Sequence, residues 1–465
     1  MNEEILENCI KAVKIGEKLG CNQVECFTSI TDSINISVKK GEIKIAKKIV
    51  DGGLGVRCVV NNAIGFSYLT NPNEIEKCVT KAFKQARSAP SDPEFKSFAE
   101  KEKYQHVYGI FDENVANLNV EDAIKFINEV LKQDFTLDKR IKSINLTFSS
   151  GRNIVAIANS LGVEGIDKGT FLYFYSSISA EENGKFSSSD EIYESRKIKD
   201  FQPIEIAKVA YEYAIKGLNK KKIPSAKVPV ILDPFASFFI IGMSLRLGLN
   251  ADAVQRKRSY LSNQIGNKIA NEKITVIDDG LLEGGIGSFK FDAEGIPSAR
   301  NIIIENGTLK NYFYDTYTAN KEGKSSTGNA VRGEGSIWNF RSLPRIDSRN
   351  LIIKEGSKNY KDFISEIKKG VYIRSTYDYP NVVTGEFSGM INEGFLIEDG
   401  EIKHALLQAG IGLNLREAFQ KIIELSKEIK WYGGIALPYI LIEEVSIAGE
   451  WINDLSVLKS IAKLK

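Results

Sequence analysis

At 465 residues the chain is too long for one ordinary hydrophobic core, so two or three domains are expected. Hydrophobic residues make up 43% of it and charged residues 26%, the proportions of a water-soluble globular protein. Lys and Arg number 62 and Asp and Glu 60, with the signs interspersed, which argues against a nucleic-acid partner because phosphate binding requires clustered positive charge.

The first segment, residues 1–104, is predicted to be an α+β domain. Apolar residues at helical spacing over 3–19 end at Gly20, and a second helix is predicted over 73–87. The Asn61-Asn62 pair between two apolar runs indicates a hairpin turn. The remaining elements are strands at 23–30, 33–38, 42–50, 56–60 and 64–69, and a polar connector at 88–104.

The second segment, residues 105–222, again mixes helices and strands and is expected to pack against the first. Asn119 is a candidate N-cap for an amphipathic helix over 120–133. The other predicted elements are strands at 143–158 and 170–194, a helix at 203–217 and a basic linker at 219–227.

The third segment, residues 228–465, is predicted to be a mainly antiparallel β domain with a barrel-like form. It opens with an apolar strand over 228–232 and a helix over 234–248, and a last helix is predicted over 415–427. Asn306-Gly307 and Asp399-Gly400 favour β-hairpins, because such turns need positive φ at two residues. The whole chain is therefore expected to be an α+β protein, with antiparallel strands and flanking helices in its N-terminal α/β part.

Histidine and cysteine usage restricts the possible chemistry. The 2 histidines, His106 and His404, lie far apart, and neither has a plausible metal-binding neighbour, so a histidine-rich zinc site is excluded. The 5 cysteines all lie between Cys9 and Cys78, without the spacing of a disulfide framework, which fits a reducing cytosol. The acidic N-terminus does not resemble a signal peptide and no apolar run reaches transmembrane length, so we expect a cytoplasmic protein with no membrane partner.

Two stretches of the third segment contain residues suited to chemistry or peptide contact. The carboxylates of Asp278, Asp279, Asp292 and Glu294 could act as acids and bases or hold a hard cation. The loop from Ser326 to Asn329 places hydroxyl groups beside Gly328, which suits contact with a peptide backbone. In both stretches the glycines, including Gly295, are equally typical of turns at strand ends.

Six short motifs occur in order along the chain: Gly53-Leu-Gly-Val-Arg57, Gly65-Phe-Ser-Tyr68, Phe291-Asp-Ala-Glu-Gly295, Ile304-Glu-Asn-Gly307, Ser326-Thr-Gly-Asn-Ala330, and Val445-Ser-Ile-Ala-Gly449 after Pro438. Each is weak alone, but together they resemble the TldD/PmbA family, once called modulators of DNA gyrase. The resemblance spans nearly the whole chain and is most specific from Val228 to Arg332. It implies a two-subunit cytosolic metalloprotease, whose partners are TldD and TldE (also called PmbA), with a β-rich C-terminal domain.

The resemblance also indicates which subunit this chain is. The TldD type carries H-E-x-x-x-H on the helix after the first C-terminal strand, where two imidazoles bind zinc and the glutamate activates water. Here the stretch begins Gly242-Met243 and ends at Leu247, so none of the three motif positions can play its part. The family's later cysteine ligand is missing too, because no cysteine follows Cys78. The chain therefore resembles TldE, with no metal site and no catalytic residue of its own.

The resemblance implies a subunit that shapes the peptide chamber of a zinc protease acting on unfolded or short peptides. Zinc is expected in a TldD-type partner, with which the chain forms a heterodimer; alone it would form a homodimer. The candidates for the peptide path, whose walls suit β-addition, are Asp292, Glu294, Gly295, Ser326, Thr327, Gly328 and Asn329. Two alternatives stay open: a self-sufficient hydrolase using carboxylates near 278–294, and a DNA gyrase-associated modulator.

Overall fold

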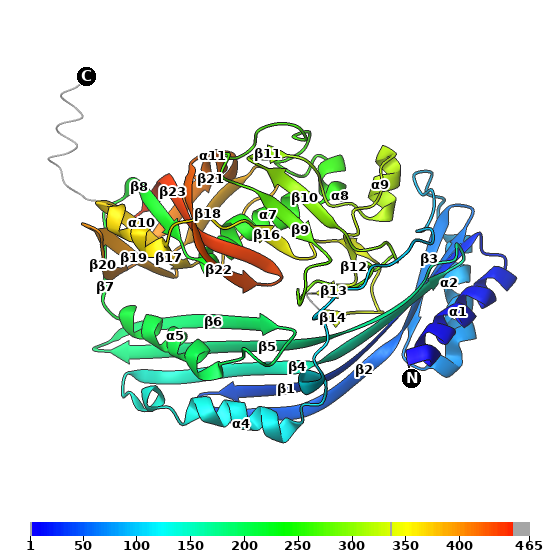
Figure 1. Ribbon diagram of the computed structural model, residues 1–465, viewed down its shortest axis with the longest axis horizontal. Coiled ribbons are helices and arrows are strands. Elements are labelled where there is room, and N and C mark those ends of the chain that lie inside the picture. The colour runs from blue at the N-terminus through cyan, green and yellow to red at the C-terminus, as the bar shows by residue number, and fades with distance from the viewer. Residues whose placement is uncertain (1, 335–336, 450–465) are drawn as a thin grey trace.

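The computed structural model describes residues 2–334 and 337–449, which form two layers (Figure 1). The lower layer is an antiparallel sheet of order β3-β2-β1-β4-β5-β6, and the upper layer is the C-terminal β domain. The strands of the lower sheet are β1 (Gln23–Lys39), β2 (Glu42–Val60), β3 (Ala63–Leu69), β4 (Ile141–Asn159), β5 (Glu164–Glu182) and β6 (Lys185–Ser195). The predicted α+β class, with an antiparallel N-terminal part and a β-rich C-terminal domain, is confirmed.

Two strands of the lower sheet, β1 and β2, are much longer than expected, and pairing of β1 with β4 places the first and second segments in one sheet. β1 pairs with β2 on one side and with β4 on the other, from Glu25 opposite Asn159 to Val38 opposite Leu146. The predicted strands 23–30 and 33–38 are therefore parts of one strand. The Asn61-Asn62 hairpin turn is confirmed by φ values of 50° and 61°.

Helices cover the two ends of these long strands and create two separate hydrophobic cores on one sheet (Figure 1). At one end α1 (Asn2–Lys18) packs on β1 and β4, and α2 (Ile75–Ser88) packs on β2 and β3. At the other end α4 (Val120–Leu131) packs on β1, β2 and β4, and α5 (Pro203–Lys216) packs on β5 and β6. The Asn119 N-cap of α4 is confirmed, because its side chain accepts a hydrogen bond from the Asp122 N–H at 2.8 Å. The short helices of this part are η1 (Pro72–Glu74), α3 (Glu113–Ala116) and η2 (Asp134–Leu137).

The described part of the C-terminal domain contains a 13-stranded sheet that branches at β23 (Ile435–Ala448), which pairs with β8, β16, β21 and β22. Most pairs are antiparallel, and both predicted hairpins are confirmed at Asn306-Gly307 and Asp399-Gly400. The other strands are β7 (Lys220–Lys221), β8 (Ala226–Leu232), β9 (Val276–Asp279), β10 (Arg300–Glu305), β11 (Thr308–Leu309), β12 (Ala330–Val331), β13 (Gly333–Glu334), β14 (Ile337–Trp338), β15 (Arg345–Ile346), β16 (Leu351–Ile353), β17 (Lys369–Ser375), β18 (Glu386–Met390), β19 (Glu393–Glu398), β20 (Glu401–Leu406), β21 (Gly410–Asn414) and β22 (Ile422–Tyr432).

Seven helical segments accompany this sheet. They are α6 (Pro234–Ser237), the π-helical turn η3 (Phe238–Gly242), α7 (Met243–Gly248), α8 (Ala251–Gln255), α9 (Thr316–Glu322), α10 (Tyr360–Glu366) and α11 (Leu415–Gln420), counted over residues 226–334 and 337–449. The helix predicted over 234–248 is confirmed as the continuous run α6–η3–α7. No helix in the described residues is long and apolar enough to cross a membrane.

Two sequence predictions differ from the structure at element ends. The helix expected over 415–427 stops at Gln420, because the next residues form β22 and pair with β23. The basic linker is also partly structured, since Lys220 and Lys221 form β7 and pair with β20. The predicted third domain runs to residue 465, and its residues 450–465 lie outside the described part.

An aromatic cluster joins the two layers. Phe27 of the lower sheet contacts Trp338, with ring centroids 6.0 Å apart, and Trp338 contacts Phe289 at 4.4 Å. The glycines of the Gly53-Leu-Gly55 motif allow this close approach, because a Cβ at Gly53 would lie 2.5 Å from the Phe340 ring. This packing fixes the position of the C-terminal domain on the lower sheet.

Candidate functional site

A cavity of about 670 Å³ lies between the lower sheet and the C-terminal domain; we call it the cleft. Phe171, Tyr173 and Glu194 of β5 and β6 line it on the sheet side. On the domain side it is lined by Met243, Arg246 and Leu247 of α7, by Arg345 and Asp347, and by Tyr379. A concave, mostly apolar and aromatic cavity with a few charged groups is the usual form of a binding site.

The helix that lines the cleft is the one on which the resemblance places the zinc motif. It begins at Pro234, where the Asp233 side chain caps the Phe235 N–H at 2.9 Å. Of the motif positions, Met243 and Leu247 face the cleft, and Leu247 is 40% exposed. The third position, Gly242, is buried against Ile435. Two of the three motif positions therefore lie at the cleft wall.

A charged group forms the domain wall of the cleft. The buried Asp347 carboxylate accepts a bidentate hydrogen bond from Arg246, with Nη2 at 2.6 Å, and another from Arg345 Nη1 at 2.6 Å. Burial raises the pKa of Asp347, but the hydrogen bonds and charges of the two arginines outweigh it and hold that pKa below its ordinary value. The carboxylate therefore stays ionised and fixes both guanidinium groups.

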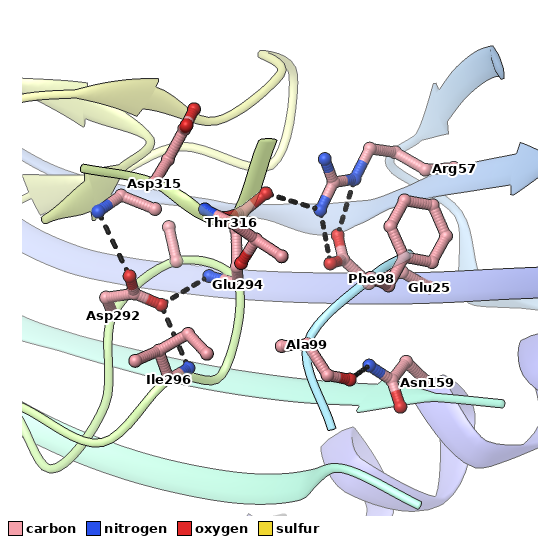
Figure 2. A network of polar contacts seen from close by, with 12 residues as sticks. Glu25, Arg57, Phe98, Ala99, Asn159, Asp292, Glu294, Ile296, Asp315 and Thr316 are labelled. Atoms are coloured by element: carbon pink, nitrogen blue, oxygen red, sulfur yellow. Dashed lines mark hydrogen bonds and ion pairs between the residues drawn. The ribbon is translucent and has the colours of Figure 1, made fainter. Parts of the chain in front are cut away.

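The predicted carboxylates Asp292 and Glu294 lie in the interior instead of lining the cleft (Figure 2). Asp292 accepts hydrogen bonds from the backbone N–H groups of Glu294, Ile296 and Ala330 at 2.9–3.0 Å. Burial, followed by the charge of Glu294, raises the pKa of Asp292 to about 7. Gly295, with a φ of 84°, forms the turn that follows Glu294. The contacts observed for Asp292 and Glu294 are internal, and a role in the peptide path stays a prediction.

Glu294 belongs to a buried ion-pair network that links the two layers (Figure 2). Its carboxylate contacts Arg57 of β2 at 3.1 Å and accepts the Thr316 N–H at 2.8 Å. Arg57 also binds Glu25 of β1, and Glu25 in turn binds Arg332 of the C-terminal domain. All the charged groups in this network are buried, so its hydrogen bonds fix the two layers in one relative position.

The predicted loop from Ser326 to Asn329 is also held by internal contacts. Ser326 Oγ and Thr327 Oγ1 each donate to the Tyr314 carbonyl at 3.1 Å. Asn329 Nδ2 donates to Asp278 at 2.7 Å, and Gly328 has a φ of 72°. These side chains organise a turn next to β12, and their peptide contact stays a prediction.

Asp278 and Asp279, the other acids predicted for a self-sufficient hydrolase, also make internal hydrogen bonds. Asp278 lies in β9, fully buried, and accepts hydrogen bonds from Asn329 and from the Arg349 N–H at 2.8 Å. Asp279 caps the next turn through the Leu281 N–H at 2.9 Å. The hydrogen bonds of both carboxylates stabilise the local backbone, and no observation favours the hydrolase alternative.

Comparison with known proteins identifies the fold and the family. Three PmbA/TldA metallopeptidase models match the chain: domain 1 over residues 24–86, the central domain over 113–218 and the C-terminal domain over 225–449. An uncharacterized protein of Methanocaldococcus jannaschii is 31% identical over 95% of this chain and 99% of its own length. The chain belongs to the PmbA/TldD metallopeptidase family.

Two further members extend the comparison. A protein of the same archaeon named as a metalloprotease is 28% identical to this family member, over 91% of the chain and 93% of its own length. The crystal structure of TldE from Thermococcus kodakarensis superposes with a TM-score of 0.86 at 24% identity and covers 95% of the chain and 100% of its own. The similarity to TldE at this identity establishes a shared fold.

A metallopeptidase family implies a metal, but the residues at the motif positions of this PmbA/TldD member do not fit one. Gly242, Met243 and Leu247 offer no imidazole, thiolate or carboxylate. Within residues 2–334 and 337–449, no group of three His, Cys, Asp or Glu residues could hold a metal ion. The helix at this wall of the cleft therefore presents apolar side chains and one arginine, and none of these is a metal ligand.

Several cleft residues of this family member were not predicted from its sequence, namely Glu194, Arg246, Asp347 and Tyr379. They come from β6, α7 and two C-terminal loops, and only the packing of the domain onto the sheet brings them together. The one local signal is the position of Arg246 inside the degenerate motif stretch.

Proposed function

We propose that this chain is the TldE-type subunit of a cytosolic zinc metalloprotease and contributes the wall of a peptide chamber. The observation that carries the proposal is the cleft wall: the motif helix lines the cavity, yet its positions are Gly242, Met243 and Leu247. A partner of the TldD type supplies the zinc and the zinc-bound water that attacks the peptide bond, because this helix has no residue that could bind the metal. The cleft binds an unfolded or short peptide.

The first prediction concerns metal content and activity. The purified chain should contain no stoichiometric zinc and should cleave no peptide, because the motif positions lack metal ligands. Co-expressed with a TldD-type partner, it should co-purify as a heterodimer that contains zinc and cleaves peptides. Metal analysis by mass spectrometry and a fluorogenic peptide assay measure both. Cleavage by the isolated chain that resists chelators would overturn the proposal.

The second prediction tests whether peptides use the cleft. Leu247→Trp should fill part of the cavity and lower kcat/KM of the complex about tenfold, equivalent to about 1.4 kcal/mol in the barrier. The matched control is Leu19→Trp, because Leu19 is 37% exposed, similar to Leu247, and lies outside the cleft. Zinc content and co-purification should be the same in both variants. Equal activity of the two would show that peptides do not occupy the cleft.

A further inference from the structure

The five cysteines of the chain lie together in one hydrophobic core, between α1, α2 and the lower sheet. All five are within the described residues, and their thiols are free. Cys9, Cys26, Cys58 and Cys78 are buried, whereas Cys21 lies at the edge of the core with part of its side chain in solvent. A reagent dissolved in water therefore reaches Cys21 most readily, because the reaction of a thiol depends on access to it.

The backbone brings Cys21 next to Cys58. β1 begins two residues after Cys21 and runs antiparallel to β2, with Val24 opposite Cys58. The Asn22 N–H donates to the Val59 carbonyl at 2.8 Å, so the residues that follow the two cysteines are hydrogen-bonded to each other. The two thiols themselves share a hydrogen bond. Adjacent backbones with the two sulfurs in contact are what a disulfide requires.

This contact makes the two thiols chemically unequal. The hydrogen bond from the Cys58 thiol lowers the pKa of Cys21 and outweighs the opposite effect of partial burial. The same hydrogen bond, followed by burial, raises the pKa of Cys58. Cys21 is therefore the first of the two to lose its proton, while Cys58 keeps its own. An accessible thiol of lowered pKa beside a second, resolving thiol is the usual arrangement of a redox-reactive cysteine pair.

We propose that Cys21 and Cys58 form a reversible thiol–disulfide pair that reacts with peroxides. The Cys21 thiolate attacks one peroxide oxygen, the O–O bond breaks, and the other oxygen leaves as water or an alcohol after taking a proton from solvent, so that Cys21 becomes a sulfenic acid. The Cys58 sulfur then attacks the Cys21 sulfur, the S–O bond breaks, and the hydroxyl group leaves as water with the proton of Cys58. The two sulfurs lose one electron each, and the peroxide gains both.

The first step of this reaction prepares the second. Once Cys21 carries an oxygen atom, its thiolate no longer accepts the hydrogen bond that raises the pKa of Cys58, so Cys58 can release its proton as it attacks. Small thiols reverse the reaction by exchange, and transient disulfides of this kind also occur in reducing compartments. Neither cysteine lines the cleft, so the pair adds a reactivity that goes beyond the proposed function.

The test treats the reduced full chain with one equivalent of hydrogen peroxide and maps its thiols by mass spectrometry without reductant. The wild type should lose two hydrogen atoms, form one disulfide between Cys21 and Cys58, and recover both thiols in dithiothreitol. Cys58→Ser should stop at the Cys21 sulfenic acid, which dimedone labels, and Cys21→Ser should give neither product. The matched control is Cys9→Ser in the same core, which should form the disulfide as the wild type does.

A second measurement separates reactivity from mere proximity. Iodoacetamide should alkylate Cys21 at pH 7 about tenfold more slowly in Cys58→Ala than in the wild type, because the thiolate loses a charge-assisted hydrogen bond, and at an unchanged rate in Cys9→Ala. The disulfide mapping uses the wild type alone, so it decides even where a variant fails to fold. A disulfide to another cysteine, a wild type whose thiols all stay free after peroxide, or equal alkylation rates in wild type and Cys58→Ala would overturn the inference.

Discussion

Replacing Glu25 with alanine is expected to lower the free energy of unfolding by about 3–5 kcal/mol, because it removes one partner from a buried ion-pair network. Glu25 binds both Arg57 and Arg332, and all three side chains are buried. Burial lowers the pKa of Arg332 to about 10, and Glu25 is the main charge that opposes this effect. Without Glu25 the Arg332 guanidinium stays buried and, among residues 2–334 and 337–449, keeps only the carbonyls of Ala293 and Ser342 as hydrogen-bond partners.

Urea unfolding followed by circular dichroism measures this loss. The matched control is Asp51→Ala, which removes the Asp51–Arg341 pair at 2.6 Å between the same two layers. That pair is solvent-exposed, with 51% and 34% of the two side chains accessible, so the loss should be about 0–1 kcal/mol. Similar losses for the two variants would show that the buried network does not hold the layers together.

The second large effect concerns pH. Glu393 of β19 is buried beside Arg374, and burial raises its pKa from 4.5 to about 7. Because the folded state holds this proton more tightly than the unfolded chain, its contribution to stability is complete below about pH 4.5 and is lost as the pH rises to about 7. As the pH rises, the free energy of unfolding of Glu393→Gln should therefore decrease by about 2–3 kcal/mol less than that of the wild type. Arg374 keeps Glu191 at 2.8 Å and Asp233 at 3.5 Å as partners.

The measurement is the free energy of unfolding at pH 4.5, 6 and 8 for the wild type and Glu393→Gln. Asp278, Asp292 and Asp315 also have raised pKa values, so the variant should show a shallower decline and not a flat profile. Glu398→Gln, exposed on the same strand, should follow the wild type. A wild-type stability that increases from pH 4.5 to 8 would contradict the assignment.

Local sequence signals predicted the turns of the fold well and the strand lengths poorly. The hairpins at Asn61-Asn62, Asn306-Gly307 and Asp399-Gly400 follow from the need for positive φ, which only a few residue types meet. The separate strands predicted at 42–50 and 56–60 are parts of one strand, β2, which runs through Gly52 and Gly53. A glycine is required at position 53 because the Phe340 ring lies close to it. This tertiary contact cannot be predicted from the local sequence. The helix expected beyond Gln420 was wrong for a similar reason, because pairing with β23 decides that stretch.

The candidate site could likewise be predicted only in part. The motif helix and its lack of metal ligands could be predicted, because one continuous stretch from Gly242 to Leu247 contains all the information. The positions of Glu194 and Asp347 could not be predicted, since these residues lie on different layers and line the same cleft only after the domain has packed. The sequence indicates Asp292 and Glu294 as candidate acids, and the structure shows internal hydrogen bonds at both carboxylates.

The shared sheet also has a consequence for the order in which the chain can fold. β1 and β2 can form a hairpin as soon as residue 60 has left the ribosome, but the other edge of β1 pairs only with β4, which ends at Asn159. Until then the growing chain exposes a long unpaired edge, the feature that invites pairing with other chains. We expect nascent chains that stall between these strands to be the most prone to aggregation, and completion of β4 to be the step that protects them.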